Sequence, residues 1–259
     1  MSQVKNVIIV CAAILAATGC KKEEPVQLAA SATAEKLASS APQTAAASEF
    51  TVKKSGSVTF LMEAPIEKIY GKVPEALEGN LFVDVKDLSK TTGNIAVNLS
   101  TLELVQRKKK DAADAEYGEE KKEPKQNEHA QQWLEIDEKV EAKSREKNKR
   151  VEFRITGIKE VSKKDISAEK GAVVVTVMAE GEFLLHQRVS KKSVELEVTV
   201  EMDAGKAKSI KLKSKKPFAV NLPEHDIGPR DNVGKVLTEL APKVAKDAMV
   251  DLDFSFDPK

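Results

Sequence analysis

The chain has 259 residues, and its 42 lysines and arginines nearly balance its 41 aspartates and glutamates, for a formal net charge of +1. This balance gives no electrostatic basis for binding nucleic acid. The two cysteines are Cys11 and Cys20, so a domain that begins beyond them has no cysteine for a disulfide and depends on packing. The length suffices for one large domain or two small ones.

The N-terminal residues carry the features of an export signal. Lys5 supplies a positive charge, and residues 7–17 form an uncharged apolar run that is shorter than the ~20 residues of a membrane-spanning helix. The sequence Leu15-Ala16-Ala17-Thr18-Gly19-Cys20 resembles a bacterial lipobox, in which the cysteine is acylated and becomes the first residue of the mature chain. We therefore expect a signal peptide over residues 1–19 and a lipid on Cys20. An ordinary secretory signal that happens to contain a cysteine is the alternative.

The residue after Cys20 bears on the destination of such a lipoprotein. Lys21 stands there instead of an aspartate, which by the usual rule predicts a lipid-anchored protein of the cell envelope, in the outer membrane and facing the periplasm. The rule differs between bacterial groups, so the inner membrane is the alternative.

Residues 20–48 are rich in alanine, serine, threonine, glutamate and proline, with almost no large apolar side chains. Such a stretch cannot bury enough surface to offset the entropy lost on ordering. We expect a flexible tether here, which holds a folded domain over residues 49–259 clear of the lipid headgroups.

From Phe50 onward, apolar residues alternate with polar ones, as they do in strands with one buried face. The alternating sets are Val58, Phe60 and Met62; Ile95, Val97 and Leu99; Val151, Phe153 and Ile155; Val194, Leu196, Val198, Val200 and Met202; Ile210 and Leu212; Phe218, Val220 and Leu222; and Leu252, Phe254 and Phe256. The β-branched run from Val173 to Val177 predicts a strand buried on both faces. Many short strands separated by glycines predict an all-β antiparallel barrel or sandwich.

Two stretches interrupt this pattern. Residues 107–126 are dense in both charge signs and predict an exposed, mobile insertion. In the stretch that follows, Trp133, Ile136 and Val140 recur at a spacing that predicts one helical face. Residues 233–250 also have a partly helical pattern, which Pro242 would break or kink.

Motifs that follow one another over most of residues 50–258 resemble the YceI-like, polyisoprenoid-binding domain family. They are Ser57–Phe60, Gly79–Asp84, Gly93–Thr101, Asn127-Glu128-His129 with Trp133-Leu134, Arg150–Phe153, and Glu180–Lys191 before the alternating strand. The resemblance implies an eight-stranded antiparallel, lipocalin-like barrel whose apolar cavity holds an isoprenoid or another long-chain lipid. Residues 106–150 are then a charged insertion with one or two helices. Asn127 replaces the usual aspartate, and Gln187 and Arg188 stand where one glycine is usual.

The candidate cavity residues are the inward positions of the alternating strands. They are Phe60, Met62, Leu81, Val97, Leu99, Phe153, Ile155, Leu196, Val198 and Val200. Alternating residues of this kind fill a core more often than they contact a ligand, and a barrel lumen of this size allows both. The resemblance adds His129, which it places near the ligand; a structural hydrogen bond that fixes the loop is the alternative.

The remaining polar motifs predict no catalytic or metal site. His186 lies in an apolar strand, where we expect a structural hydrogen bond. His225 lies between Glu224 and Asp226, with no second histidine or cysteine nearby, which is a poor metal-binding pattern. The sequence contains no G-x-S-x-G, phosphate-binding glycine loop or H-E-x-x-H motif. It therefore predicts a binding protein with no cofactor beyond a bound lipid, not an enzyme, and leaves its oligomeric state open.

Two functions follow from this pattern. One is a membrane-anchored lipoprotein that carries or sequesters a long-chain lipid, such as an isoprenoid, a quinone precursor or a fatty-acid derivative. The other is a cell-envelope lipoprotein whose barrel is packed solid and which acts through protein contacts made by the insertion. In an intermediate case, the helical segment at Trp133 covers the mouth of the barrel and controls entry.

Overall fold

The structure is a computed structural model that describes residues 32–230 and 245–259. Its strands are β1 (Ala32–Thr33), β2 (Ser48–Val52), β3 (Ser57–Ala64), β4 (Glu67–Pro74), β5 (Leu77–Val83), β6 (Thr92–Asn98), β7 (Glu103–Lys108), β8 (Arg150–Lys159), β9 (Gly171–Leu185), β10 (Arg188–Asp203), β11 (Lys206–Ser214), β12 (Phe218–Asn221) and β13 (Asp247–Pro258). The helices are α1 (Pro124–Trp133) and α2 (Ala142–Asn148), with short 3-10 turns η1 (Leu88–Lys90), η2 (Leu99–Thr101) and η3 (Pro223–His225). The predicted signal peptide, Cys20 and most of the second helical stretch lie outside the described residues.

Eight of these strands close into an antiparallel barrel. The ring runs β2-β5-β6-β8-β9-β10-β11-β13 and returns to β2, because β13 pairs with β11 on one side and with β2 on the other. The pairs Leu212↔Phe254 and Phe256↔Val52 complete the ring. The predicted eight-stranded barrel with helical insertions is therefore confirmed.

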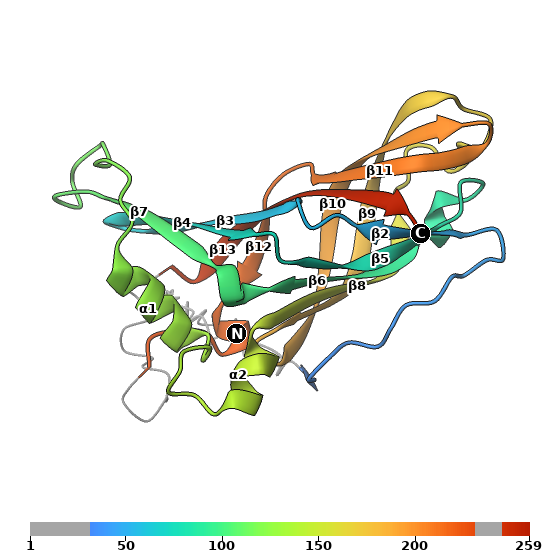
Figure 1. Cartoon of the computed structure of the whole chain (residues 1–259). Helices are drawn as coiled ribbons and strands as arrows, with labels where there is room; N and C mark the ends of the chain where they lie inside the picture. The colour runs from blue at the N-terminus through green and yellow to red at the C-terminus, as the bar shows by residue number, and fades with distance from the viewer. Residues whose placement is uncertain (1–31, 231–244) are drawn as a thin grey trace, which may run out of the picture.

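At one end, the barrel wall extends beyond the ring. β3 and β4 continue β2 and β5 in the same register, as the pairs Ser48↔Val83 and Ser57↔Pro74 indicate. β7 adds to β4, and β12 adds to β13. Figure 1 shows β3, β4 and β7 projecting from the barrel, with α1 beside them. This extension and α1 contribute to the walls of the cavity described below, together with strands of the ring.

The strands bury one face each, as expected from their alternation. Along β9, Val173, Val175 and Val177 are buried, whereas Val174 is 59% exposed. The prediction that this run is buried on both faces was therefore wrong. The outer face of an antiparallel barrel strand meets solvent unless another element covers it, and Val174 is uncovered.

Residues 32–47, which we expected to be part of a flexible tether, lie against the outside of the barrel. β1 pairs with the start of β10, and farther along the Leu37 N–H donates to Glu152 Oε2 (3.1 Å). The Ser40 N–H donates to Asn94 Oδ1 (2.6 Å), and the Thr44 hydroxyl donates to Asp84 Oδ2 (2.7 Å). The segment thus crosses β10, β8, β6 and β5 before it enters the barrel as β2. We call residues 32–47 the strap.

The charged insertion is exposed over most of residues 107–126, as predicted. The helix after it differs from the prediction. It begins at Pro124 and ends at Trp133, and Glu135 has a positive φ of 51°. The chain therefore leaves the helix before Ile136 and Val140, so the three apolar residues do not share one helical face. Within the described residues, no helix has the length and apolar character needed to cross a membrane.

Candidate functional site: an apolar cavity in the barrel

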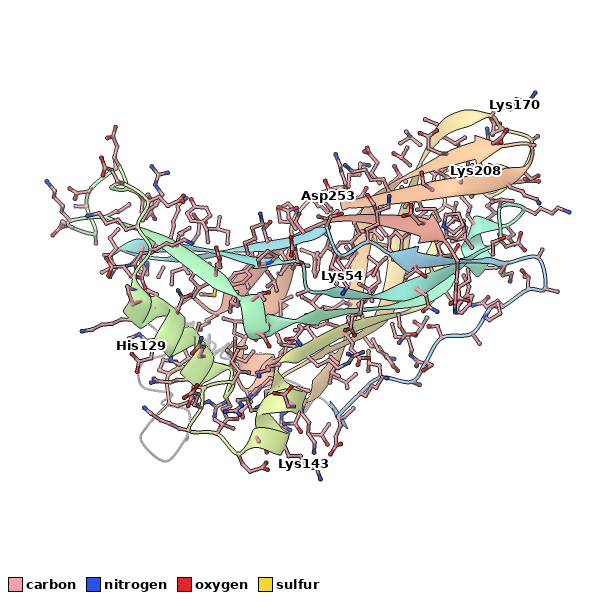
Figure 2. The ribbon with its side chains drawn as sticks, in the orientation of Figure 1. Lys54, His129, Lys143, Lys170, Lys208 and Asp253 are labelled. Atoms are coloured by element: carbon pink, nitrogen blue, oxygen red, sulfur yellow. The ribbon has the colours of Figure 1, made fainter. Side chains whose placement is uncertain are left out.

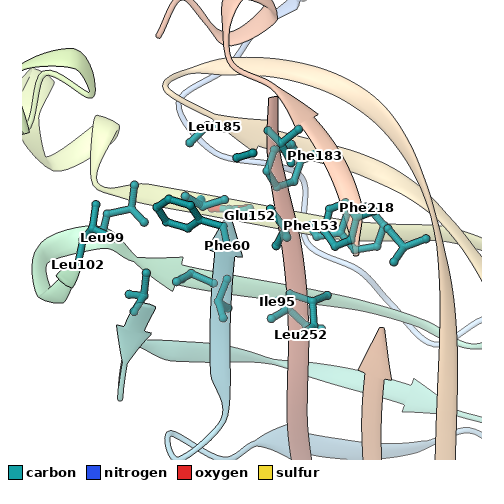
Figure 3. Close-up of a pocket in the computed structure, with 18 of the residues that line it drawn as sticks. Phe60, Ile95, Leu99, Leu102, Glu152, Phe153, Phe183, Leu185, Phe218 and Leu252 are labelled. Carbon is teal, nitrogen blue, oxygen red and sulfur yellow. The ribbon is translucent and has the colours of Figure 1, made fainter. Parts of the chain in front are cut away.

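The barrel contains an apolar cavity of about 190 Å³ at the end where β3, β7, β12 and α1 lie. The close-up in Figure 3 shows Phe60, Phe153, Phe183 and Phe218 pointing into the same space, and Ala130, Trp133 and Leu134 contribute from the helical insertion. Glu152 is part of the wall, but its carboxylate bonds to Leu37 and Arg150. The cavity surface is wholly apolar.

The size of the cavity limits what it can hold. It is somewhat larger than an engineered apolar cavity of about 150 Å³ that takes up benzene, and smaller than the about 300 Å³ at which most ligand pockets begin. A cavity of 190 Å³ therefore accommodates a segment of an apolar chain. A longer chain has to move side chains of the lining.

Two glycines lie beneath phenylalanine rings of this cavity. Phe153 on β8 lies beside Gly181 on β9, and a Cβ at position 181 would come within 2.6 Å of its Cζ. Phe60 on β3 is directly paired with Gly71 on β4, and a Cβ at position 71 would also meet the ring. With no side chain at the glycine, each ring lies on the barrel wall. The rings therefore leave the middle of the lumen open.

A second, smaller chamber of about 40 Å³ lies deeper in the barrel, toward η1. Leu88 of η1, Leu81, Val198 and Val200 are among the residues that line it. Ile155, Leu196 and Leu212 line both chambers, and each is 4% exposed. These side chains separate the two spaces.

The structure distributes the predicted ligand-binding residues between the two chambers. The main cavity is lined by Phe60, Met62, Val97, Leu99, Phe153, Ile155 and Leu196. The second chamber is lined by Leu81, Val198 and Val200, together with Ile155 and Leu196. Sequence reasoning missed Phe183, Leu185 and the α1 residues, although Phe183 stands in the resemblance motif and Trp133 in the helical pattern.

His129 lies away from both chambers. It is exposed on α1, and Figure 2 shows its side chain directed away from the barrel. The residues of α1 that line the cavity are Ala130 and Trp133, and His129 is not among them. The expected position of His129 near a ligand is therefore corrected. Its neighbour Asn127 has a structural contact, since its Oδ1 accepts a hydrogen bond from the Leu104 N–H (3.0 Å).

His225 is the last residue of η3, which lies at the cavity end of the barrel. The ring is fully buried and packs edge-on against Phe183, with centroids 5.4 Å apart. Its Nδ1 lies 3.1 Å from the Leu185 carbonyl oxygen, so Nδ1–H donates, and Nε2 lies 3.3 Å from the Ser190 hydroxyl. Burial lowers the pKa of His225 below its ordinary value. Both ring nitrogens thus have protein partners.

His186 and Gln187 form the two-residue turn between β9 and β10. Both have positive φ, 48° and 58°, where glycine is usual. Their side chains hold the turn to the insertion: His186 Nε2 lies 3.0 Å from Glu135 Oε2, and Gln187 Nε2 donates to Asn148 Oδ1 (2.7 Å). These contacts fasten the turn to the insertion.

Both ring nitrogens of His186 lie within hydrogen-bond distance of a protein oxygen. His186 Nδ1 lies 3.0 Å from the His225 carbonyl oxygen, which only accepts, so this nitrogen carries hydrogen. The other ring nitrogen, Nε2, lies 3.0 Å from Glu135 Oε2. Burial lowers the pKa of His186, while the Glu135 carboxylate acts to raise it. This arrangement is a structural contact, as expected for His186.

Among residues 32–230 and 245–259, no group of three or more histidine, cysteine, aspartate or glutamate side chains is placed to hold a metal ion. His225 instead contacts the groups described above. The apolar cavity is therefore the feature of the described structure that best fits a ligand.

No protein-family model matches the chain, and no curated protein matches its sequence. Two solved structures are similar in fold. BcnA of Burkholderia cenocepacia is 11% identical, with 79% of this chain and 96% of that chain covered and a TM-score of 0.44. A polyisoprenoid-binding domain from Saccharophagus degradans, implicated in plant cell wall breakdown, is 10% identical, with 82% and 99% covered and a TM-score of 0.46. Neither likeness is close enough to establish family membership.

Proposed function

We propose that this protein is a lipid-anchored lipoprotein of the cell envelope that binds a long-chain lipid in its barrel, for carriage or sequestration. The observation that carries the proposal is the wholly apolar cavity of about 190 Å³ inside a closed barrel. Each methylene buried there contributes ~0.8 kcal/mol, so a chain binds without any hydrogen bond inside the lumen.

The composition of the wall supports an apolar chain as the ligand. Buried polar groups of a binding site require polar partners on the ligand, and this surface offers none. A sugar, nucleotide or peptide would leave its own polar groups unpaired in the cavity. An isoprenoid, quinone tail or acyl chain would not.

The anchoring part of the proposal rests on the sequence alone. The apolar run of residues 7–17 and the lipobox-like residues before Cys20 support an acylated N-terminus. Acyl chains on that residue would hold the barrel at a membrane, where its ligand is available.

The test is mass spectrometry of organic extracts from the purified protein. The chain should begin at Lys21, behind a cleavable signal that adds no lipid, so that anchor lipids are not extracted and the strap is retained. A stoichiometric long-chain lipid is the expected result. An empty extract, with no binding of isoprenols or fatty acids offered afterwards, would contradict it and favour a packed barrel that acts through protein contacts.

A further inference from the structure

We propose that Ile155, Leu196 and Leu212 form a partition that sets the length of apolar chain the barrel accepts. This inference rests on the proposed function and adds a specificity to it. The three side chains come from β8, β10 and β11, and they are the residues that line both the main cavity and the deeper chamber.

The partition lies across the path of a chain that enters from the α1 end. The main cavity of about 190 Å³ lies on one side, and the chamber of about 40 Å³ lies on the other. Beyond the second chamber the lumen ends at η1, where Leu88 is buried and its N–H is bonded to the Lys164 carbonyl oxygen (2.9 Å). A chain therefore reaches the partition first, and the closed end of the barrel behind it.

The backbones of the three partition residues lie in strands and not in loops. Leu212 is paired with Val198 on one side and Phe254 on the other, inside continuous antiparallel ladders. Ile155 is paired with Gly93 and Gly181. Interiors packed in this way resist the movement of single side chains. A bound chain gains little by pushing past the partition.

Both chambers select the same chemistry. The main cavity is apolar throughout, and Thr91 is the one polar residue among the described residues that line the second chamber. The ligand class is therefore a single hydrocarbon chain whose polar end stays at the α1 side. The partition then discriminates by length, because chains of equal polarity differ only in how far they extend.

The experiment compares the affinities of linear saturated alcohols that increase by one methylene at a time. For the unaltered chain beginning at Lys21, we expect affinity to rise about fourfold per methylene, the equivalent of ~0.8 kcal/mol, and then to level off. In Leu212→Ala the two chambers join. The chain length at which affinity levels off should therefore increase by at least two methylenes. The longest alcohols should then bind at least about 15-fold more tightly to the variant, at about fourfold for each of the two methylenes.

Leu88→Ala is the matched control. It removes the same atoms from the second chamber without opening the partition, so its length limit should equal that of the unaltered chain. If Leu212→Ala does not fold, Leu196→Val opens a narrower passage at the same level. If affinity levels off at the same chain length in the partition variant (Leu212→Ala or Leu196→Val) and in Leu88→Ala, the proposed partition is wrong. Absence of binding by every alcohol to every variant would instead contradict the proposed function.

Discussion

The ring of Phe60 occupies the space that a side chain at position 71 would need. The two residues are directly paired across β3 and β4, and a Cβ at Gly71 would lie 2.1 Å from Cζ of the ring. Because Phe60 lines the main cavity, the glycine determines whether the ring lies on the wall or projects into the lumen.

Gly71→Ala should therefore fill the cavity. The new methyl group displaces the Phe60 ring inward, where it takes up space in the cavity, so lipid affinity should weaken; the forced repacking itself costs about 1–3 kcal/mol of stability. Gly157→Ala is the control, because a Cβ there meets no atom within 4 Å. Adding Phe60→Leu to Gly71→Ala should restore binding, and the test is titration with a fluorescent fatty acid. Unchanged affinity in Gly71→Ala would show that the ring does not limit the cavity.

The contact between Asn127 and Leu104 predicts a role for α1 in ligand exchange. Ala130 and Trp133 of this helix line the cavity, and the Asn127 side chain fastens the helix to β7. Asn127→Ala should accelerate ligand release several-fold in stopped-flow displacement, because local opening becomes easier. Asn127→Asp retains the acceptor and should release ligand at the original rate. Equal rates in all three proteins would mean that the ligand leaves by another path.

The contacts of the strap predict that it stabilises the fold, although its composition indicated a flexible tether. Glu152 is 2% exposed, and it depends on the Leu37 N–H and Arg150 for hydrogen bonds. Its cross-strand neighbours Ala96 and Leu184 are also buried on this outer face. A chain that begins at Ser48 should lose about 2 kcal/mol or more in urea unfolding, because it exposes apolar surface and removes the donor.

The comparison for this truncation is a chain that begins at Ala32, which keeps every strap contact described above. It should unfold at the same urea concentration as the chain that begins at Lys21. If the chain from Ser48 also unfolds there, the strap contributes nothing to stability.

The buried state of His225 predicts a pH dependence of stability. Burial lowers the folded-state pKa below the unfolded value of 6.5, so the unfolded chain binds the proton more readily. Stability should be complete above about pH 6.5 and should decrease as the pH falls from there toward the folded-state pKa. Urea midpoints at about pH 7.5 and about pH 5.5 measure this. His225→Gln should show a smaller decrease, and an equal decrease in both proteins would assign the effect to other groups.

The proposed anchor makes a separate prediction. Cys20→Ser removes the residue that would carry the acyl chains, which supply the membrane affinity of a lipoprotein. The protein should move from the membrane pellet to the soluble fraction after cell lysis and centrifugation. Continued sedimentation with membranes, despite loss of fatty-acid labelling, would mean that another part of the chain holds the protein there.

Most of the strands were predictable because apolar and polar residues alternate along them, whereas β9 was predicted from its β-branched run, and β4 and β7 were not predicted from alternation. The helix at Trp133 was mispredicted beyond its end, because the left-handed conformation of Glu135 is a local backbone feature that apolar spacing does not report. The strap was missed for a different reason. Leu37 contacts Glu152 across 115 positions of sequence, and composition carries no information about such a distant partner.

The cavity was predictable as a set of inward positions but not as a shape. Alternation identified Phe60, Phe153 and Leu196 as inward-facing, and the structure places all three in the lining. Whether these side chains enclose a cavity depends on how far each extends into the lumen. It also depends on the residue on the neighbouring strand, such as a glycine beside a phenylalanine. The predicted position of His129 near a ligand was wrong. It rested on a resemblance, whereas the structure places the neighbouring Ala130 in the cavity lining.

The strap also determines where on the barrel a membrane anchor at Cys20 would be attached. It starts beside the β9–β10 turn, with β1 paired to Val189 and Arg188, at the end of the barrel that carries the cavity. If Cys20 is the anchor, eleven residues separate it from the strap, and a chain of that length reaches at most about 40 Å. The point of attachment would then lie at the cavity end of the barrel, and not at the η1 end.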